Sequence, residues 1–166
     1  MKYLKKASKS PASGEDDARR IVQDMLAEIE TIGEQKVREY AEKLDQWTGD
    51  IIVSADEIKA AGESLSQRAR DDIQFAYERV EKFAKAQLQS MAEFETELSP
   101  GLIAGQRLIP VQTAGCYIPG GRYAHIASAV MSVTTAKVAG CQHITACSPP
   151  AKDAGIAPAI IYAAHH

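Results

Sequence analysis

The stretch that decides the fold is Ala114-Gly-Cys-Tyr-Ile-Pro-Gly-Gly121, an apolar run that leads straight into a proline and two glycines. We expect residues 114–118 to form a short strand and the following residues to form a loop. Residues 126–139 are small and β-branched, and Gly140 follows them, which predicts a helix with a glycine directly after its end.

A second strand and a second helix are expected after that helix. His143–Cys147 predicts a buried strand that Ser148-Pro-Pro150 stops, and Ile156–His166 predicts the start of a helix with Pro158 in its first turn. Strand, loop, helix, strand, loop, helix is typical of a parallel βαβ unit. Because two parallel strands are too few to be stable by themselves, we expect this sheet to be incomplete.

The residues before Pro100 differ sharply in composition from those after it. Beyond Pro100 the only charged side chains are Arg107, Arg122, Lys137, Lys152 and Asp153. This asymmetry predicts an exposed helical layer followed by a buried α/β layer. We therefore expect a flexible arm over residues 1–14, a helical region over residues 15–99, and a partial nucleotide-binding domain over residues 100–166.

Apolar spacing predicts the elements of the helical region. One helix is expected from Glu15 to a break at Gly33, and a second one ends near Trp47. Ser54 and Glu57 have the spacing of a capping box that opens a short helix. The longest helix is expected over Ser66–Glu95, with an apolar stripe in steps of three and four residues that is typical of a core face. Leu102–Ala104 and Arg107–Val111 predict a hairpin around Gly105-Gln106.

Composition excludes several classes of function. The chain has 166 residues and a formal net charge of −3, with its basic residues scattered, which does not favour nucleic acid binding. No apolar run approaches the roughly 20 residues that a membrane span needs, and no secretory signal is apparent. Three cysteines without a Cys-x-x-Cys spacing predict small buried side chains in a reducing compartment, and thus a cytoplasmic protein.

The loop after residue 118 is the candidate site. In an α/β sheet, a ligand binds where a strand ends in a glycine-rich loop before a helix. Gly120 and Gly121 can adopt positive φ and allow the backbone amides to approach a ligand closely. The N-terminus of the following helix suits a bound anion. Tyr117 offers a flat ring and a hydroxyl to a nucleotide. The residues alone leave a plain strand-to-helix turn equally open, because the segment is neither Gly-x-Gly-x-x-Gly nor a phosphate-binding P-loop.

Several motifs in the same order and spacing resemble the histidinol dehydrogenase family. They are Gly105-Gln-Arg107, Pro110, Gly115-Cys-Tyr-Ile-Pro-Gly-Gly121, Ala136-Lys-Val-Ala-Gly140, Ser148-Pro-Pro150 and the helix at Pro158–Ala164. The resemblance implies the N-terminal part of a zinc- and NAD-dependent alcohol dehydrogenase that is an intertwined homodimer with a Rossmann-like sheet. It also implies that Tyr117 contacts NAD, with Pro119, Gly120 and Gly121 as neighbouring cofactor residues.

The segment Arg122–Ser132 departs from the Pro- and Leu-rich stretch that most histidinol dehydrogenases have there. It resembles the branch of the family that oxidises 2,3-dihydroxypropane-1-sulfonate to sulfolactate. Arg122 and His125, near a helix N-terminus, would suit a sulfonate. Contact of Arg122 with cofactor phosphate or solvent stays open, as does a purely structural role for His125. The alternatives for the whole chain are L-histidinol oxidation and a non-catalytic helical interaction module.

The resemblance implies that the catalytic residues and the zinc ligands lie beyond residue 166, so we assign no catalytic or metal-binding residue to this chain. His165 and His166 are adjacent on a helix and point about 100° apart, so they cannot easily share an ion. We therefore expect the chain to be inactive by itself.

Overall fold

The computed structural model describes residues 13–120, 123–151 and 154–165, and the chain divides into two compact units, 1–48 and 49–166. The composition boundary at Pro100 does not coincide with the boundary between the units, because the helices of residues 55–89 pack with the α/β segment that follows them. Within the described residues, no helix combines the length and the apolar character needed to cross a bilayer.

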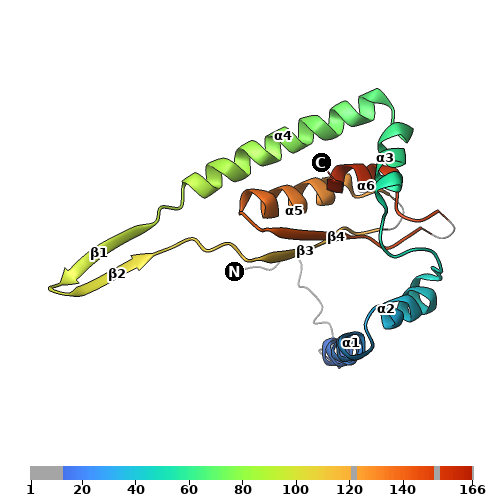
Figure 1. Cartoon of the computed structure of the whole chain (residues 1–166), viewed down its shortest axis with the longest axis horizontal. Helices are drawn as coiled ribbons and strands as arrows, with labels where there is room; N and C mark the ends of the chain where they lie inside the picture. The colour runs from blue at the N-terminus through green and yellow to red at the C-terminus, as the bar shows by residue number, and fades with distance from the viewer. Residues whose placement is uncertain (1–12, 121–122, 152–153, 166) are drawn as a thin grey trace, which may run out of the picture. The chain divides into compact units, whose positions relative to one another are not determined.

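The first unit consists of helix α1 (Ser13–Ile32), helix α2 (Glu34–Tyr40) and one turn of π-helix, η1 (Ala41–Asp45) (Figure 1). Gly33 separates α1 from α2 with a φ of 79°. This confirms the predicted break, since a residue with a side chain rarely adopts this conformation. The helix begins at Ser13, so the last two residues of the predicted arm are helical. Residues 1–12 lie outside the described part of the chain.

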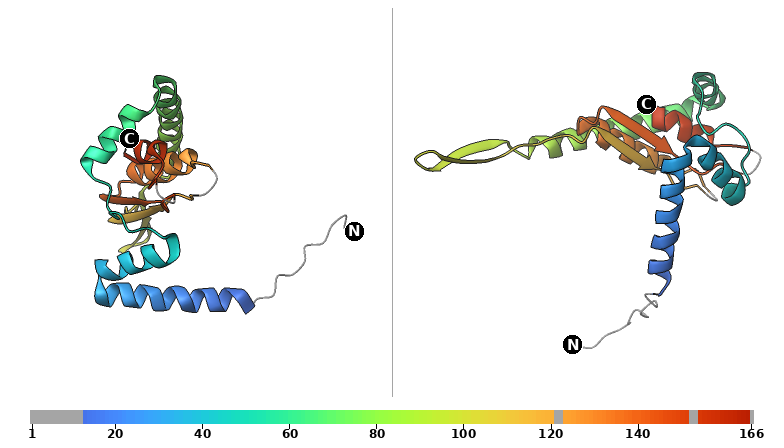
Figure 2. Two further views of the ribbon diagram at one scale, coloured as in Figure 1. Left: turned by 90° about the vertical axis from the view of Figure 1, so that its right-hand side faces the viewer. Right: turned by 60° about the horizontal axis from the view of Figure 1, so that its bottom comes forward.

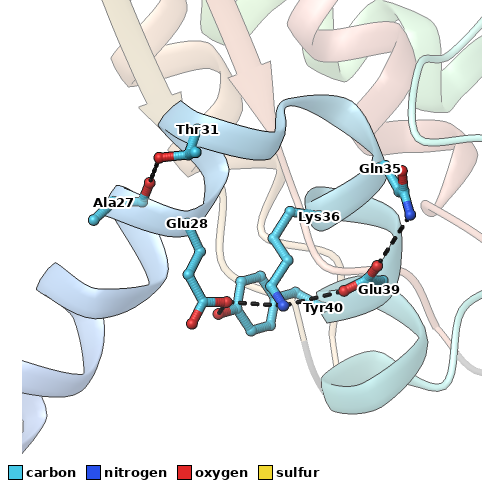
Figure 3. A network of polar contacts seen from close by, with 7 residues as sticks. All are labelled: Ala27, Glu28, Thr31, Gln35, Lys36, Glu39 and Tyr40. Atoms are coloured by element: carbon cyan, nitrogen blue, oxygen red, sulfur yellow. Dashed lines mark hydrogen bonds and ion pairs between the residues drawn. The ribbon is translucent and has the colours of Figure 1, made fainter.

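A polar network connects α1 to α2 (Figure 3). Nζ of Lys36 lies 2.8 Å from Glu28 and 3.1 Å from Glu39, and the hydroxyl of Tyr40 donates to Glu28 at 2.8 Å. These contacts lower the pKa of Glu28, chiefly through Lys36, and raise the pKa of Lys36 and of Tyr40, chiefly through Glu28. The four side chains therefore fix how the two helices meet inside this unit.

The second unit opens with two capped helices, α3 (Ala55–Ser64) and α4 (Gln67–Gln89). At the start of α3, Glu57 N–H donates to the Ser54 hydroxyl at 3.2 Å, while Ser54 N–H donates to the Glu57 carboxylate at 2.7 Å. These reciprocal bonds confirm the predicted capping box. Ser66 caps α4 with its own hydroxyl, accepting from Ala69 N–H at 3.2 Å.

Helix α4 is shorter than predicted, and the hairpin lies elsewhere than predicted. The helix ends at Gln89, and residues that we assigned to its last turn form strand β1 (Phe94–Ser99) instead. β1 pairs antiparallel with β2 (Leu102–Gln106) around a turn that contains Gly101 at a φ of 81°. The predicted turn at Gly105-Gln106 is wrong, because both residues pair within the ladder and Pro100-Gly101 makes the turn.

The predicted βαβ unit is confirmed, but its second strand is exposed and not buried as predicted. Strand β3 (Thr113–Tyr117) pairs parallel with β4 (His143–Cys147), and helix α5 (Ile126–Val138) connects them. Gly140 follows α5 with a φ of 87°. A positive φ is expected for the glycine after a helix end. Helix α6 (Pro158–His165) follows β4 and packs against α3 and α5.

Helix α5 lies between the β3–β4 sheet and α4, and the hairpin extends away from these layers (Figure 2). The core joins one face of the sheet to the helices through Ile73, Ile118, Ala129, Val130, Ile160 and Ala163. The stripe on α4 is only partly core, since Ile73 and Ala84 are buried whereas Phe83 is 66% exposed. The structure is thus a mixed α/β fold, with helices first and two small sheets after them.

Candidate functional site at the carboxyl end of the parallel strands

The candidate site begins where β3 ends. Alternate residues of a strand face opposite sides of the sheet. Cys116 and Ile118 are buried beneath α5, while Tyr117 points to the other side and is 66% exposed. Ile118 N–H donates to the Cys147 carbonyl at 2.8 Å, which extends the ladder one residue past β3. The buried Ile118 therefore anchors the strand end that presents the Tyr117 ring.

The two loops that leave the parallel strands touch at Gly120 and Pro149. A Cβ on Gly120 would lie 2.5 Å from Cγ of Pro149 and 3.3 Å from the Pro149 carbonyl oxygen, so no larger residue fits there without movement. Gly120 is not among the described glycines with positive φ. A glycine is therefore required at position 120 because the two loops pack closely together. It is not required by an unusual backbone conformation. Pro119 beside it is half-buried.

Helix α5 starts at the same edge of the sheet. His125 is its N-cap residue and is exposed, and its carbonyl accepts from Ser128 N–H at 3.0 Å and Ala129 N–H at 3.3 Å. The imidazole itself makes no capping hydrogen bond. The N-terminal end of α5 carries the positive end of the helix dipole, which favours a negatively charged group nearby.

The described residues bring only part of the predicted site together. Tyr117, Pro119 and Gly120 lie close together along the end of β3, and His125 follows at the start of α5. Gly121 and Arg122, which we assigned to cofactor and substrate, lie outside the described residues. Their predicted roles stay predictions.

Ser148 is a residue at this edge that the sequence analysis did not assign. It directly follows β4, and its hydroxyl is buried without a hydrogen-bond partner among the described residues. Buried polar atoms nearly always have a partner, so such a hydroxyl stands out. The signal available in the sequence was a hydroxyl residue placed directly after a predicted strand, at the edge where a ligand is expected.

The described residues do not fit a zinc site, because no group of three or more His, Cys, Asp or Glu side chains among them could hold a metal ion. The three cysteines are free, but only Cys116 is buried; Cys141 is half-buried and Cys147 is exposed. The prediction of buried cysteines is therefore wrong for Cys147, which shares the uncovered face of the sheet with Tyr117.

These features define an α/β protein with a parallel βαβ unit and a glycine-containing loop at the carboxyl end of its first strand. Residues 8–166 match the family described as "Histidinol dehydrogenase". The chain belongs to the histidinol dehydrogenase family.

Relatives of known name cover nearly the whole chain. It is 56% identical over 163 residues to a "Histidinol dehydrogenase homolog" of Pelagibacter ubique, with 98% of this chain and 38% of the relative covered. It is 52% identical over 165 residues to a "Sulfopropanediol 3-dehydrogenase" of Ruegeria pomeroyi, with 99% and 38% covered. The crystal structure of histidinol dehydrogenase from Elizabethkingia anophelis matches with a TM-score of 0.80 and 30% identity, covering 99% of this chain and 36% of that one. The chain therefore spans little more than a third of the length of these relatives.

Proposed function

We propose that this chain is part of an NAD- and zinc-dependent alcohol dehydrogenase that oxidises 2,3-dihydroxypropane-1-sulfonate to sulfolactate, and that it contributes one side of the nucleotide site. The observation that carries the proposal is the exposed Tyr117 ring at the carboxyl end of a parallel βαβ unit in a chain of this family. Ligands of open α/β sheets bind at this edge.

The residues at the edge fit the binding of a nucleotide. Tyr117 offers an exposed aromatic face on which a flat ring can stack, and Pro119 and Gly120 continue the same surface. Helix α5 follows this loop in the sequence, and a helix N-terminus favours a phosphate. When bound, NAD would accept the hydride from the substrate alcohol, while this chain's residues hold and orient the cofactor.

The sulfonate substrate is supported by charge and by the comparison. Arg122 and His125 precede the N-terminus of α5, where a permanent anion such as a sulfonate is favoured. The relative named "Sulfopropanediol 3-dehydrogenase" is 52% identical, whereas the histidinol dehydrogenase of the matching crystal structure is 30% identical. Oxidation of L-histidinol is the second candidate, and the TM-score of 0.80 to that structure is the observation that favours it.

The interaction-module alternative receives less support. A docking helix needs a free apolar face, but the face of α4 that carries Ile73 and Ala84 is buried within its own unit. Phe75 and Phe83 are the exposed phenylalanines of α4, and two separate side chains do not make a continuous apolar face. We also propose that the whole enzyme is a homodimer and that its zinc ligands lie outside this chain.

Titration of the isotope-labelled chain with NAD tests the cofactor part. We expect saturable NMR shifts confined to the amides around Tyr117, Gly120 and Ser148, and their loss in Tyr117→Ala. Tyr123→Ala, which removes an aromatic ring that is 78% exposed, is the matched control. Saturable shifts elsewhere, or none, would contradict the proposed site. The chain alone is expected to produce no NADH.

The substrate is tested in a chimera in which the rest of the Ruegeria pomeroyi relative follows this chain. We expect kcat/KM for the sulfonated diol to exceed that for L-histidinol, and the Arg122→Ala/His125→Ala double variant to raise KM for the diol at least tenfold. An unchanged KM for the diol in that variant would show that neither residue contributes to substrate binding.

A further inference from the structure

Two helices begin at the carboxyl edge of the parallel sheet. Helix α5 connects the end of β3 to the start of β4, and α6 follows the end of β4, so both run back from that edge (Figure 1). The two helices contact each other and lie on the same side of the sheet. The positive ends of both helix dipoles are therefore at one edge and on one face of the sheet.

Ser148 directly follows β4 at this edge, and its side chain faces the helices. Successive residues of an extended chain point to opposite faces of a sheet. Cys147 is exposed on the uncovered face, whereas the hydroxyl oxygen of Ser148 exposes less than 1 Å². On the neighbouring strand, Tyr117 is the register partner of Cys147, and Ile118 after it is buried beneath α5. The Ser148 hydroxyl therefore lies on the helix-covered face, as Ile118 does.

This hydroxyl is the one buried side-chain nitrogen or oxygen atom without a hydrogen-bond partner among the described residues. A buried polar group without a partner is unfavourable, because it has lost its bonds to water and gained none in return. The residue as a whole is half-buried. A rotation about its single side-chain torsion can therefore bring the hydroxyl to a ligand at the edge without moving the backbone.

The surroundings of Ser148 favour an anion. Residues 113–120, 123–151 and 154–165, which the structure describes, contain no aspartate or glutamate. The first hydrogen bonds of α5 start at the N–H groups of Ser128 and Ala129, which donate to the His125 carbonyl. The N–H groups of Ile126 and Ala127 consequently have no carbonyl partner within the helix. An anionic oxygen at this edge would meet donor groups and no carboxylate from these segments.

We propose that Ser148 is a nucleotide-binding residue, whose hydroxyl donates a hydrogen bond to a phosphate oxygen at the N-terminal ends of α5 and α6. The inference rests on the proposed function, because it concerns the same edge of the sheet. Tyr117 lies on the opposite face, so the nucleotide crosses the edge, with a flat ring on the uncovered face and its phosphates on the helix-covered face. The loops that it crosses meet at Gly120 and Pro149.

Titration with ADP and with adenosine separates the phosphate contact from the ring contact, because adenosine has no phosphate. In the isotope-labelled chain, Ser148→Ala should weaken ADP binding about tenfold, since a hydrogen bond to a charged group is lost, and should leave adenosine binding unchanged. Tyr117→Ala should weaken both. Ser132→Ala is the control, because its hydroxyl donates to the Ser128 carbonyl at 2.7 Å within α5, and it should bind both normally. Equal ADP binding by Ser148→Ala and the unaltered chain would overturn the proposal.

Inorganic pyrophosphate distinguishes this inference from the proposed function. We expect it to shift the amide resonance of Ser148 in a saturable way, and we expect no saturable shift at this position in Ser148→Ala. Absence of the shift in the unaltered chain would overturn the proposal. Pyrophosphate binding at Ser148 without any binding of NAD would contradict the proposed function and leave the phosphate contact intact. NAD binding that depends on Tyr117 but not on Ser148 would overturn the phosphate contact and leave the proposed function intact.

Unfolding in urea without a ligand gives a readout that a purely structural role of Ser148 would move in the other direction. Removal of a buried hydroxyl without a partner breaks no hydrogen bond, so Ser148→Ala should unfold at an equal or higher urea concentration than the unaltered chain. Ser66→Ala is the control, because its hydroxyl accepts from Ala69 N–H at 3.2 Å, and it should unfold at a lower concentration. A lower midpoint for Ser148→Ala would show that its hydroxyl is bonded within the chain and would overturn the proposal.

Discussion

Gly120 and Pro149 hold the loops that leave β3 and β4 in direct contact, with only 2.5 Å between Cγ of Pro149 and the place where a Cβ on Gly120 would be. The two residues come from loops separated in sequence by helix α5 and strand β4. Their contact sets the distance between the two loops at the carboxyl edge of the sheet, where Tyr117 and Ser148 also lie. The arrangement of the candidate site therefore depends on a small residue at position 120.

Replacing Gly120 by alanine should force these loops apart. Overpacking of this kind costs about 1–3 kcal/mol, and we expect a loss of that size in the free energy of unfolding measured with urea. Gly115→Ala is the matched control, because nothing lies within 4 Å of its Cβ position. Equal stability of Gly120→Ala and the unaltered chain would show that the loops separate readily.

Ile118→Ala should be the more destabilising change. The side chain is 1% exposed and belongs to the core that joins β3 to α4, α5 and α6. Truncation of such a residue leaves a cavity and costs about 2–5 kcal/mol. The control is Ile109→Ala, at a side chain that is 83% exposed. It should change stability by less than about 0.5 kcal/mol. Similar values for the two variants, again from urea unfolding, would exclude Ile118 from the core.

Gly101→Ala should weaken the β1–β2 hairpin. Gly101 has a φ of 81°. An L-residue in the left-handed region costs about 1–2 kcal/mol. Because every residue of both strands is exposed, we expect the loss to appear as weaker cross-strand nuclear Overhauser effects and not as global unfolding. Ser99→Ala is the control, since it leaves the turn conformation unchanged. A hairpin that persists in Gly101→Ala would show that the turn is not decisive.

Glu57 makes the stability of α3 depend on pH. Ser54 N–H and the Ser54 hydroxyl hold the pKa of Glu57 below its ordinary value of 4.5. The unfolded chain therefore binds the proton more readily, so the stabilisation is complete above that value and is lost as the pH falls through the folded pKa. Glu57→Gln should lose less stability than the unaltered chain between about pH 6 and about pH 3. Glu63→Gln is the control, and an identical acid dependence in all three proteins would contradict the prediction.

Local signals in the sequence predicted much of the second unit. Ser54 and Glu57 identify a helix start by their hydrogen-bonding chemistry, and Gly140 identifies a helix end by its backbone freedom. The alternation of apolar strands with a helix predicted the parallel pair. The flat ring and hydroxyl of Tyr117, next to the glycine-rich loop, favour a contact with a nucleotide. The ring is exposed in the structure, and its role in binding stays a prediction.

Other features depend on contacts that periodicity does not reveal. Met91 and Phe94 continue the helical spacing of α4. The turn at Pro100-Gly101 nevertheless lets Phe94 pair with Gln106 in the β1–β2 hairpin. The contact of Gly120 with Pro149 joins residues that are distant in sequence. The sequence therefore offered only conformational freedom and close approach of the backbone to a ligand as reasons for a glycine there. The exposure of Cys147 follows from the sheet having a helix on one face only among the described residues.

The core of the second unit also dictates the order in which this protein can fold during synthesis. Its buried members extend from Ile73 in α4 to Ala163 in α6, so the core cannot close until the ribosome has released almost the whole of this segment. The contacts between α1 and α2, by contrast, join neighbouring residues and can form as soon as both helices have emerged. We therefore expect folding on the ribosome to occur in two stages, with Ile73 of α4 in contact with water until the later one.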